Sequence, residues 1–504
     1  MSGTDIAAAR AALEAGRGAI LVRERVADLD TPVGAFLKLT GGAQANAFLL
    51  ESIEGGAARG RYSAIGMAPD LVWRCRGGKA EINRHALSAP HAFEPEAGPA
   101  LDSLRRVIGA ARMPVPAGLP PMAAGLFGYL GYDMVRLIEK LPETNPDVLG
   151  IPDAVLTRPT LMAVFDHVRD TLTLCAPVWP GGEPGAAIEA AEARLDEAEA
   201  ALDRPVPRPA PPAVLPKLGE PDSNFTEAGF IAAVEKAKEY IRAGDAFQIV
   251  PSQRFSVPFA LPPFSLYRAL RRINPAPFLV FGDFGGFSVV AASPEILVRC
   301  RDNTVTVRPL AGTRRRGATP EEDRALEVEL LADPKERAEH LMLLDLGRND
   351  VGRVAEIGSV KVTAQFQIER YSQVMHIGSE VQGRLRAGLD ALDAYAAGFP
   401  AGTLTGAPKI RAMEIIEELE PSRRGLYAGG IGYFGADGGM DTCIALRTAL
   451  VKDGIMHVQA GAGVVADSNP RAEYEECHQK ARALFRAAEE AVRFAAGRRE
   501  RGNA

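Results

Sequence analysis

The sequence predicts an α+β fold in which large antiparallel β-sheets pack as a sandwich with helices outside. Strand-like runs follow one another across 278–312 and again across 427–466, with only short turns between them. Consecutive strands joined by short turns favour antiparallel pairing. The helical segments stand outside these series, so we expect them to cover the outer faces of the sheets.

The first part of the chain supplies strands, one long helix and a linker. The runs at 46–52 and 70–76 are strand-like, and 183–203 reads as an exposed amphipathic helix. Residues 204–224 are dense in proline, which is typical of a semi-rigid linker or a surface crossing. The chain therefore divides into an N-terminal region at 1–203, a linker at 204–224, a C-terminal domain at 225–490 and a tail at 491–504.

The second part opens with a helix over 225–245, whose apolar residues recur at helical spacing and which Thr226 can cap. Two more helices are predicted to begin at Asp333-Pro334 and at Asn469-Pro470, because a capping side chain there precedes a proline at the first helical position. Another helix follows the glycine- and threonine-rich loop of 399–421 and stops at Pro421. Strands are expected at 247–257, 278–284, 287–293, 304–312, 427–435, 441–451 and 455–466.

Composition argues against several kinds of partner and structural framework. The 504 residues carry a formal net charge of −6, which does not favour nucleic acid as a partner. The five cysteines contain no CxxC pair, so a zinc ribbon or disulfide framework is not indicated, and a reducing cytoplasm is expected. The sequence shows no signal peptide and no apolar run long enough to cross a bilayer, so no membrane association is expected.

The first acidic segment lies at the start of the helix predicted from 334. Glu336 and Glu339 are one turn apart on one face, just where the helix becomes apolar. Glu336 has a local alternative, because a glutamate at the third helical position can complete a capping box with Asp333. His340 is more commonly a satisfied core histidine than a ligand.

The second acidic segment lies at the start of the helix predicted from 470. Glu473, Glu476 and Lys480 share one face, and the plain alternative is a surface Glu–Lys pair. Two helices that each offer Glu-x-x-Glu would repel if they faced each other, unless a divalent cation lay between them. Oxygen ligands suit Mg²⁺, whereas zinc would prefer histidine or cysteine. We therefore expect Mg²⁺ as the cofactor.

Several loops could bind an anion. Gly312-Thr313 lies beside three arginines, and Gly461 and Gly463 precede the second acidic helix. Arg447 falls within the predicted strand 441–451, and a buried arginine near a hydroxyl such as that of Tyr427 is suited to a carboxylate. Each loop alone is weak evidence, since glycines at turns are ordinary. Together they indicate a small substrate with more than one carboxylate.

These motifs also resemble a known family. "KERAEHLMLLDLGRND", "RYSQVMHIGSEV", "FPAGTLTGAPKIRAMEIIEELEP", "RGLYAGGIGY" and "GAGVVADSNPRAEYEECHQKA" are similar, in order, to the signatures of the chorismate-utilising enzymes. The resemblance is dense over 225–490, and "LLES" and "RYSAIG" resemble the regulatory half of the family. It implies an N-terminal tryptophan-binding region and a C-terminal chorismate-binding domain.

Two positions imply which branch of the family the chain resembles. Gln248 stands where isochorismate and salicylate synthases carry a lysine that activates water, which suits ammonia as the nucleophile. Ala311 in "PLAGT" stands where aminodeoxychorismate synthases typically carry a lysine. The resemblance therefore implies anthranilate synthesis, in which chorismate and ammonia give anthranilate and pyruvate, the first step towards tryptophan. Aminodeoxychorismate synthesis and a non-catalytic, tryptophan-sensing relative remain the alternatives.

The resemblance implies a role for each site residue. Glu339 and Glu476 would hold Mg²⁺, with Glu336 and Glu473 behind them or acting through waters. Gln248 would meet ammonia, Glu295 would protonate the leaving C4 hydroxyl, and His376 with Thr403 would serve the loss of pyruvate. The implied substrate-binding residues are Gly312, Thr313, Tyr427, Arg447, Gly461, Ala462, Gly463 and Lys480.

Partners follow from the same resemblance. None of the five cysteines lies on a tight turn between glycines, so the ammonia is expected from a separate glutamine amidotransferase subunit, the second component of the enzyme, in a heterotetramer. L-Tryptophan is the expected feedback inhibitor. Its site would be formed by Ser52, Pro277, Phe278 and Leu279.

Overall fold

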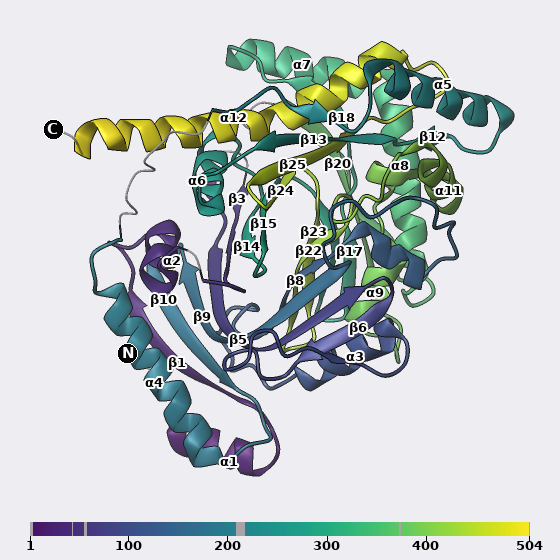
Figure 1. Cartoon of the computed structure of the whole chain (residues 1–504). Helices are drawn as coiled ribbons and strands as arrows, with labels where there is room; N and C mark the ends of the chain where they lie inside the picture. Colours follow the sequence, from purple (N-terminus) through teal and green to yellow (C-terminus); the bar gives the residue numbers. More distant parts are fainter. Residues whose placement is uncertain (1–3, 43, 55–57, 208–216, 372–373, 503–504) are drawn as a thin grey trace.

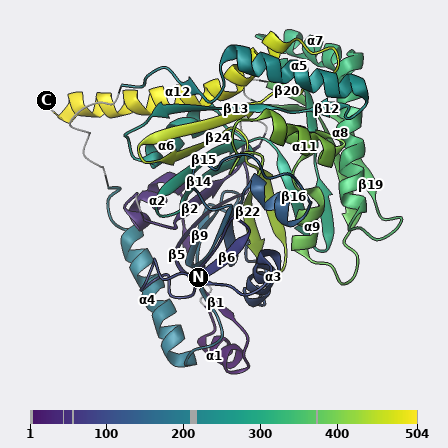
Figure 2. The ribbon, with the colours of Figure 1, turned by 45° about the vertical axis from the view of Figure 1, so that its right-hand side comes forward.

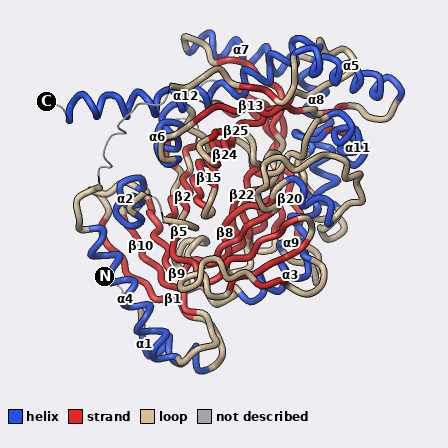
Figure 3. Tube along the Cα trace, in the orientation of Figure 1, coloured by secondary structure: helices blue, strands red, loops and turns tan. Residues whose placement is uncertain are grey.

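The computed structural model describes residues 4–42, 44–54, 58–207, 217–371 and 374–502 of the chain. Its centre is one antiparallel hydrogen-bonded network of 21 strands that divides into two branches (Figures 1 and 3). Two short two-stranded sheets stand apart from it, β12 (Gln248–Ile249) with β21 (Gly406–Ala407), and β3 (Ile53–Glu54) with β4 (Ala58–Arg59).

The first branch joins strands from both parts of the chain. In pairing order, its strands are β1 (Ala19–Val26), β10 (Thr171–Val178), β9 (Ala154–Asp166), β5 (Tyr62–Arg76), β2 (Phe48–Glu51), β14 (Phe278–Asp283), β15 (Phe287–Ser293), β24 (Thr448–Lys452), β25 (Ile455–Gly461), β13 (Ser252–Pro258) and β11 (Asp222–Ser223). The β2–β14 pairing ties the N-terminal region directly to the C-terminal domain.

The second branch begins at β9 residues 154–157, on the same edge that pairs with β10 at residues 162–166. In pairing order it runs through β8 (Gly125–Leu130), β22 (Gly430–Gly435), β23 (Met440–Ile444), β16 (Ile296–Arg301), β17 (Thr304–Val307) and β20 (Val374–Arg384), which also pairs with β18 (Leu310–Arg315) and β19 (Lys361–Arg370). β6 (Lys79–Asn83) pairs with β5, and β7 (Glu94–Pro95) with β6.

Apolar side chains of the two branches meet face to face. Val280 and Leu450 of the first branch share a buried cluster with Ile431 and Cys443 of the second. Two larger clusters lie on the outer faces, where helices cover the sheet. The sandwich with helices outside is therefore confirmed, although the two layers are branches of one sheet rather than separate sheets.

The helices lie on these outer faces (Figure 2). They are α1 (Ile6–Glu14), α2 (Pro32–Thr40), α3 (Ala100–Ala110), the 3₁₀ helix η1 (Tyr132–Leu137), α4 (Pro184–Leu202), α5 (Glu227–Ala243), α6 (Pro263–Ile273), α7 (Pro320–Ala332), α8 (Pro334–Gly352), α9 (Ala391–Gly398), α10 (Gly402–Thr405), α11 (Lys409–Leu419) and α12 (Pro470–Gly502). Within the described ranges, none of them combines the length and apolarity that a bilayer crossing requires.

Local capping explains where the functional helices begin. Thr226 accepts a hydrogen bond from the Gly229 amide at 3.1 Å and caps α5. Asp333 accepts from the first-turn amides of α8, and Asn469 does the same for α12. The three predicted helix starts are confirmed, because each depends on residues only two or three positions apart.

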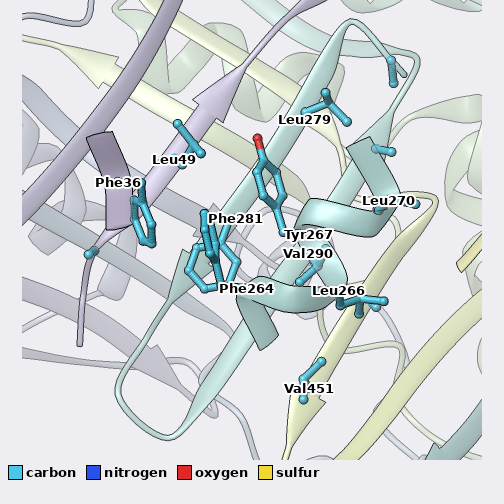
Figure 4. Packing of buried hydrophobic residues seen from close by; sticks show 14 of the residues in the cluster. Phe36, Leu49, Phe264, Leu266, Tyr267, Leu270, Leu279, Phe281, Val290 and Val451 are labelled. Carbon is cyan, nitrogen blue, oxygen red and sulfur yellow. The ribbon is translucent and has the colours of Figure 1, made fainter. Parts of the chain in front are cut away.

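A dense aromatic core binds α6 to the first branch. Figure 4 shows Phe264 and Tyr267 of α6 beside Phe281 of β14 and Phe36 of α2. The Phe36 and Phe264 rings stack with centroids 4.5 Å apart, and Phe281 meets Phe264 edge to face. This core fixes β14 against β2 of the N-terminal region.

The predicted domain division stays a prediction, and the structure shows which elements lie at its boundaries. The chain division at 204–224 does not divide the sheet, since β2 pairs with β14 and β8 with β22. Residues 208–216 of the proposed linker lie outside the described residues. The proposed tail at 491–504 continues α12 as far as residue 502, and residues 503–504 lie outside the described part.

Candidate active site

The candidate site lies where the chain crosses between the two branches of the sheet. Glu295 lies between β15 of the first branch and β16 of the second, and Arg447 lies between β23 and β24. The crossings are side by side, because the Ala292 amide donates to the Arg447 carbonyl and the Ile444 amide donates to the Glu295 carbonyl.

The expectation that Arg447 lies within a strand is wrong. β23 ends at Ile444, and Arg447 has a left-handed backbone with φ +48°. A regular strand cannot continue here, because the chain leaves one branch and joins the other. The turn presents the arginine between the layers. Within the described ranges its guanidinium forms no ion pair, and burial lowers its pKa.

Glu295 is buried and hydrogen-bonded. Its carboxyl accepts from the Thr403 hydroxyl at 3.2 Å and, weakly, from the Leu310 amide at 3.5 Å. Burial raises the pKa of Glu295 to about 8, so the carboxyl holds a proton at neutral pH. A protonated carboxyl in such a place can serve as a general acid. Thr403, which the resemblance assigned to the same step as His376, is instead in contact with Glu295.

His376 projects from β20 beside β18. Its Nδ1 lies 3.0 Å from the Gly312 carbonyl oxygen and 3.0 Å from the Thr313 hydroxyl. A carbonyl only accepts, so Nδ1 carries the proton and Nε2 has the free lone pair. Gly312 has φ +73° where the β18–β20 register shifts, which turns its carbonyl towards the imidazole.

Electrostatics keep the His376 ring neutral. Burial, and next the positive charge of Arg447, lower the pKa of His376 to about 4. Near neutral pH the imidazole can therefore accept a proton at Nε2. The pKa of Glu295 is raised and that of His376 is lowered. At neutral pH one group is therefore protonated and the other is not, which is the arrangement that an acid and a base require.

Glu339 projects from α8 towards β12 and the loop after β25. Its Oε1 accepts from the Gln248 amide nitrogen at 3.1 Å, while the Gln248 carbonyl oxygen is buried without a partner among the described residues. A Cβ atom at position 463 would lie 2.6 Å from that amide nitrogen, so the close approach requires Gly463. Burial raises the pKa of Glu339, and the charges of Glu336 and Glu476 raise it further.

The charge of Glu476 on α12 thus acts on Glu339 of α8, while the predicted shared cation stays a prediction. The carboxylates of α8 and α12 also have local partners. Glu336 pairs with Arg314 at 3.2 Å, and Glu476 pairs with Lys480 at 2.8 Å on the half-exposed start of α12. Glu473 accepts from Ser468, and burial raises its pKa. The Glu–Lys pair that was the plain alternative for this helix is therefore formed, at the edge of the site.

The capping-box alternative for Glu336 is wrong. The Asp333 amide, which Glu336 would have to reach, already donates to the Glu329 carbonyl at the end of α7. The Glu336 carboxylate turns to Arg314 instead. His340 behaves as a core histidine, fully buried with Nε2 2.6 Å from the Ser379 hydroxyl.

The residues present fit a divalent cation that is held partly by substrate. Within the described ranges, no group of three or more His, Cys, Asp and Glu side chains could hold a metal ion. Mg²⁺ characteristically needs only one or two carboxylates and completes its shell with water and substrate oxygens. Glu339 of α8 and Glu476 of α12, whose charge acts on Glu339, offer oxygen ligands of that kind.

The predicted anion-binding loop at 461–463 is only partly free. The Ala462 amide donates to the Pro251 carbonyl at 3.1 Å, so it is not available to a substrate. Lys480 donates to the Gly461 carbonyl at 2.9 Å, which holds the ammonium group at the edge of the loop. The Tyr427 hydroxyl lies beside Gly461, 3.0 Å from the place of a Cβ atom.

The residues predicted to bind tryptophan are brought together. β2 pairs with β14 so that Glu51 faces Leu279, and the Ile53 amide donates to the Ala276 carbonyl. Ser52, between them, therefore lies alongside Pro277 and Phe278. Phe278 faces Ser293 across the β14–β15 pair, only two residues from Glu295.

Sequence reasoning missed the arginine nearest to Tyr427. The fully buried Arg424 lies over the Tyr427 ring, 5.4 Å from its centroid, and pairs with Glu420. Both stand in the quoted motifs "EELEP" and "RGLYAGG", where an unexplained charged residue inside an apolar setting was the available signal. Arg314 was also missed, although it belongs to the "TRRRG" run.

Comparisons with known proteins identify the family of the chain. A profile described as chorismate binding enzyme matches residues 60–486. The chain belongs to the chorismate-binding enzyme family. The match spans the proposed linker, in keeping with a sheet that both parts of the chain build. The resemblance to the chorismate-utilising enzymes that the motifs indicated is confirmed.

Similar proteins and solved structures show which members of this family the chain resembles. The chain is 59% identical to the anthranilate synthase component 1 of Cereibacter sphaeroides, over 96% of this chain and 97% of that protein. It is 47% identical to that of Thermus thermophilus, over 92% and 96%. A crystal structure of anthranilate synthase component I from Streptococcus pneumoniae matches with a TM-score of 0.76 at 37% identity, over 91% of this chain and 98% of that one. The menaquinone-specific isochorismate synthase of Escherichia coli, with 19% identity and a TM-score of 0.69, shares the fold.

Proposed function

We propose that this chorismate-binding enzyme is the large subunit of an anthranilate synthase, which converts chorismate and ammonia into anthranilate and pyruvate. One observation carries the proposal: Glu295, whose pKa burial raises, and His376, whose pKa burial lowers, lie in one site with Arg447, which forms no ion pair with the residues that the structure describes. Chorismate has two carboxylates and requires one proton to be given and one to be removed. The similarity to proteins named anthranilate synthase component 1 supports the same reaction.

In the first step ammonia attacks C2 of chorismate while the C4 hydroxyl leaves. Glu295 gives its proton to that hydroxyl, which departs as water, and both ring double bonds shift. The ammonium formed at C2 then releases one proton and Glu295 regains one, so that no net proton is consumed. Thr403 holds the carboxyl in place through its 3.2 Å hydrogen bond. The unpaired carbonyl oxygen of Gln248 is suited to accept an N–H of the incoming ammonia.

In the second step the ring becomes aromatic. His376 takes the C2 proton at Nε2, the bond from C3 to the enolpyruvyl oxygen breaks, and the departing enolpyruvate gains a proton to become pyruvate. The Gly312 carbonyl keeps the proton on Nδ1 and so keeps Nε2 available. Arg447 and Tyr427 would hold the enolpyruvyl carboxylate, and Gly312 and Thr313 would contact the ring.

Mg²⁺ would be held by Glu339 and Glu476, with Glu336 and Glu473 behind them. When bound, it would neutralise the ring carboxylate and draw electron density from the ring. Lys480, at the Gly461 carbonyl, adds positive charge on the same side. Glu339, which burial and neighbouring carboxylates make costly to ionise, would gain most from the cation.

Ammonia would come from a separate glutamine amidotransferase subunit, component II, in a heterotetramer in the cytoplasm. All five cysteines are buried, which does not suit a glutaminase nucleophile. L-Tryptophan would inhibit by binding at Ser52, Pro277, Phe278 and Leu279. The direct pairing of Phe278 with Ser293 offers a short path from that site to Glu295.

The test is a product assay on the purified chain with chorismate, Mg²⁺ and either ammonium or glutamine. We expect anthranilate fluorescence and pyruvate in equal amounts with ammonium, and neither with glutamine. An amino product without pyruvate would instead indicate an aminodeoxychorismate synthase. Tryptophan binding without turnover would indicate a sensing protein. Glutamine-dependent activity of the isolated chain would refute the separate amidotransferase.

A further inference from the structure

A fully buried ion pair lies behind the candidate active site. Glu420 ends α11, and Arg424 lies in the loop that leads to β22; they are 4% and 2% exposed. Arg424 Nη2 lies 2.6 Å from Glu420 Oε1, and Nε donates to the same carboxylate at 3.0 and 3.1 Å. Neither residue is among those expected to touch the substrate.

The other donors of Arg424 reach backbone carbonyls of two catalytic segments. Nη1 donates to the Leu404 carbonyl at 2.7 Å, one residue after Thr403. Nη2 donates to the Val250 carbonyl at 2.7 Å, two residues after Gln248. One planar guanidinium therefore sets the distance between the threonine at the acid and the glutamine beside Glu339.

Glu420 extends the network to a third segment. Its Oε1 accepts from the amide of Ser252 at 2.8 Å and from the Ser252 hydroxyl at 2.7 Å. That hydroxyl accepts in turn from the side-chain amide of Gln459, which stands on β25 two residues before Gly461. The neighbouring Pro251 carbonyl holds the Ala462 amide. The loop at 461–463 is thus tied to the same pair.

A fourth segment is held by the face of the guanidinium. Its carbon lies 4.9 Å from the ring centroid of Tyr132 and 5.4 Å from that of Tyr427. A cation over an aromatic face is attractive and fixes the plane of the ring. The Tyr427 hydroxyl is thereby kept beside Gly461.

We propose that the Arg424–Glu420 pair is a positioning element, which fixes Thr403, Gln248, Tyr427 and the 461–463 loop relative to one another. The inference rests on the proposed function, because these are the groups assigned to ammonia and chorismate. A buried ion pair is not required for stability, since well-packed apolar residues often stabilise a fold equally well. Catalytic rates, in contrast, can fall about 100-fold for a displacement of about 1 Å.

The experiment separates positioning from stability. The variants are Arg424→Lys, Ser252→Ala and the double variant Arg424→Met with Glu420→Leu. Arg158→Lys is the control, because Arg158 forms a bidentate pair with Asp70 at 2.8 Å in the N-terminal region. Melting temperature, kcat and the chorismate KM are measured with ammonium as the amine donor, well below each melting temperature.

We expect kcat to fall at least about tenfold in Arg424→Lys and in the double variant, and KM to rise less than kcat falls. The double variant should melt closer to wild type than Arg424→Lys does, because no buried charge is left unpaired. Ser252→Ala removes one link without leaving a charge, so it should fold and lose kcat about threefold or more. The control should lower the melting temperature and keep kcat within about twofold.

Wild-type kcat in a stable double variant or in Ser252→Ala would overturn the proposal. The proposal would also be overturned if kcat fell in parallel with the melting temperature in the control as it does in the other variants. A wild-type chain that forms no anthranilate would refute the proposed function itself, and the role of the pair with it. The two failures are thus distinguished by the wild-type assay.

Discussion

Replacing Glu295 with glutamine removes the proton that we assign to the leaving hydroxyl. The change keeps the shape of the side chain, so the hydrogen bond with Thr403 can survive. Burial raises the pKa of Glu295 from 4.5 to about 8. Each tenfold change in an acid constant corresponds to about 1.4 kcal/mol, so ionised Glu295 costs the folded state about 5 kcal/mol as an upper value.

The sign of the stability effect follows from proton linkage. Between pH 4.5 and about 8 the folded state binds this proton and the unfolded state has lost it, so the free energy of unfolding falls as the pH rises. The contribution is fully present below pH 4.5 and is lost as the pH rises through about 8. Glu295→Gln does not titrate there, so its stability relative to wild type should rise with pH.

The assay follows kcat/KM for chorismate from about pH 5 to about pH 9, with unprotonated ammonia held constant. Wild-type activity should fall above about pH 8, where Glu295 ionises. Glu295→Gln should lose about 10² to 10⁴ in kcat and show no such fall. Glu321→Gln, at an exposed acid of α7, should keep both the rate and the profile. A variant with near wild-type kcat, or one that keeps the fall above pH 8, would refute the assignment.

Three further predictions address the other groups. His376→Ala should still consume chorismate with ammonium but should release little pyruvate and little fluorescent anthranilate; equal loss of both steps would contradict the assignment. Glu339→Gln should abolish the rise in melting temperature that Mg²⁺ and chorismate produce together and should lower kcat about 100-fold or more, whereas Glu356→Gln, near the far end of α8, should change neither. Ser52→Phe should raise the tryptophan concentration needed for inhibition at least about tenfold without changing the uninhibited rate; an unchanged inhibition curve would remove Ser52 from the inhibitor site.

Local signals in the sequence were sufficient for the helix starts and for the antiparallel class of the sheet. Thr226, Asp333 and Asn469 cap their helices because capping joins atoms two or three residues apart. The antiparallel sandwich followed from consecutive strands with short turns. The motifs also named residues that the structure brings into contact, Glu295 with Thr403 and Gln248 with Glu339, although neither pairing was predicted.

Long-range effects explain what the sequence did not reveal. Periodicity placed Arg447 in a strand, because no local signal shows that the chain there changes from one branch to the other. The Glu336 capping box was plausible from spacing, but α7 ends immediately before α8 and occupies the Asp333 amide. Arg424 was missed because its partners Leu404, Val250 and Glu420 come from three separate segments.

The most direct test of the central electrostatic claim is calorimetric titration of the wild-type chain with chorismate, without ammonia, in the presence and absence of Mg²⁺. The proposed arrangement requires Glu339 and Glu476 to share the cation with a substrate carboxylate. It therefore predicts that saturating Mg²⁺ tightens chorismate binding at least about tenfold, and that chorismate tightens Mg²⁺ binding by the same factor. Equal chorismate affinity with and without Mg²⁺ would contradict it.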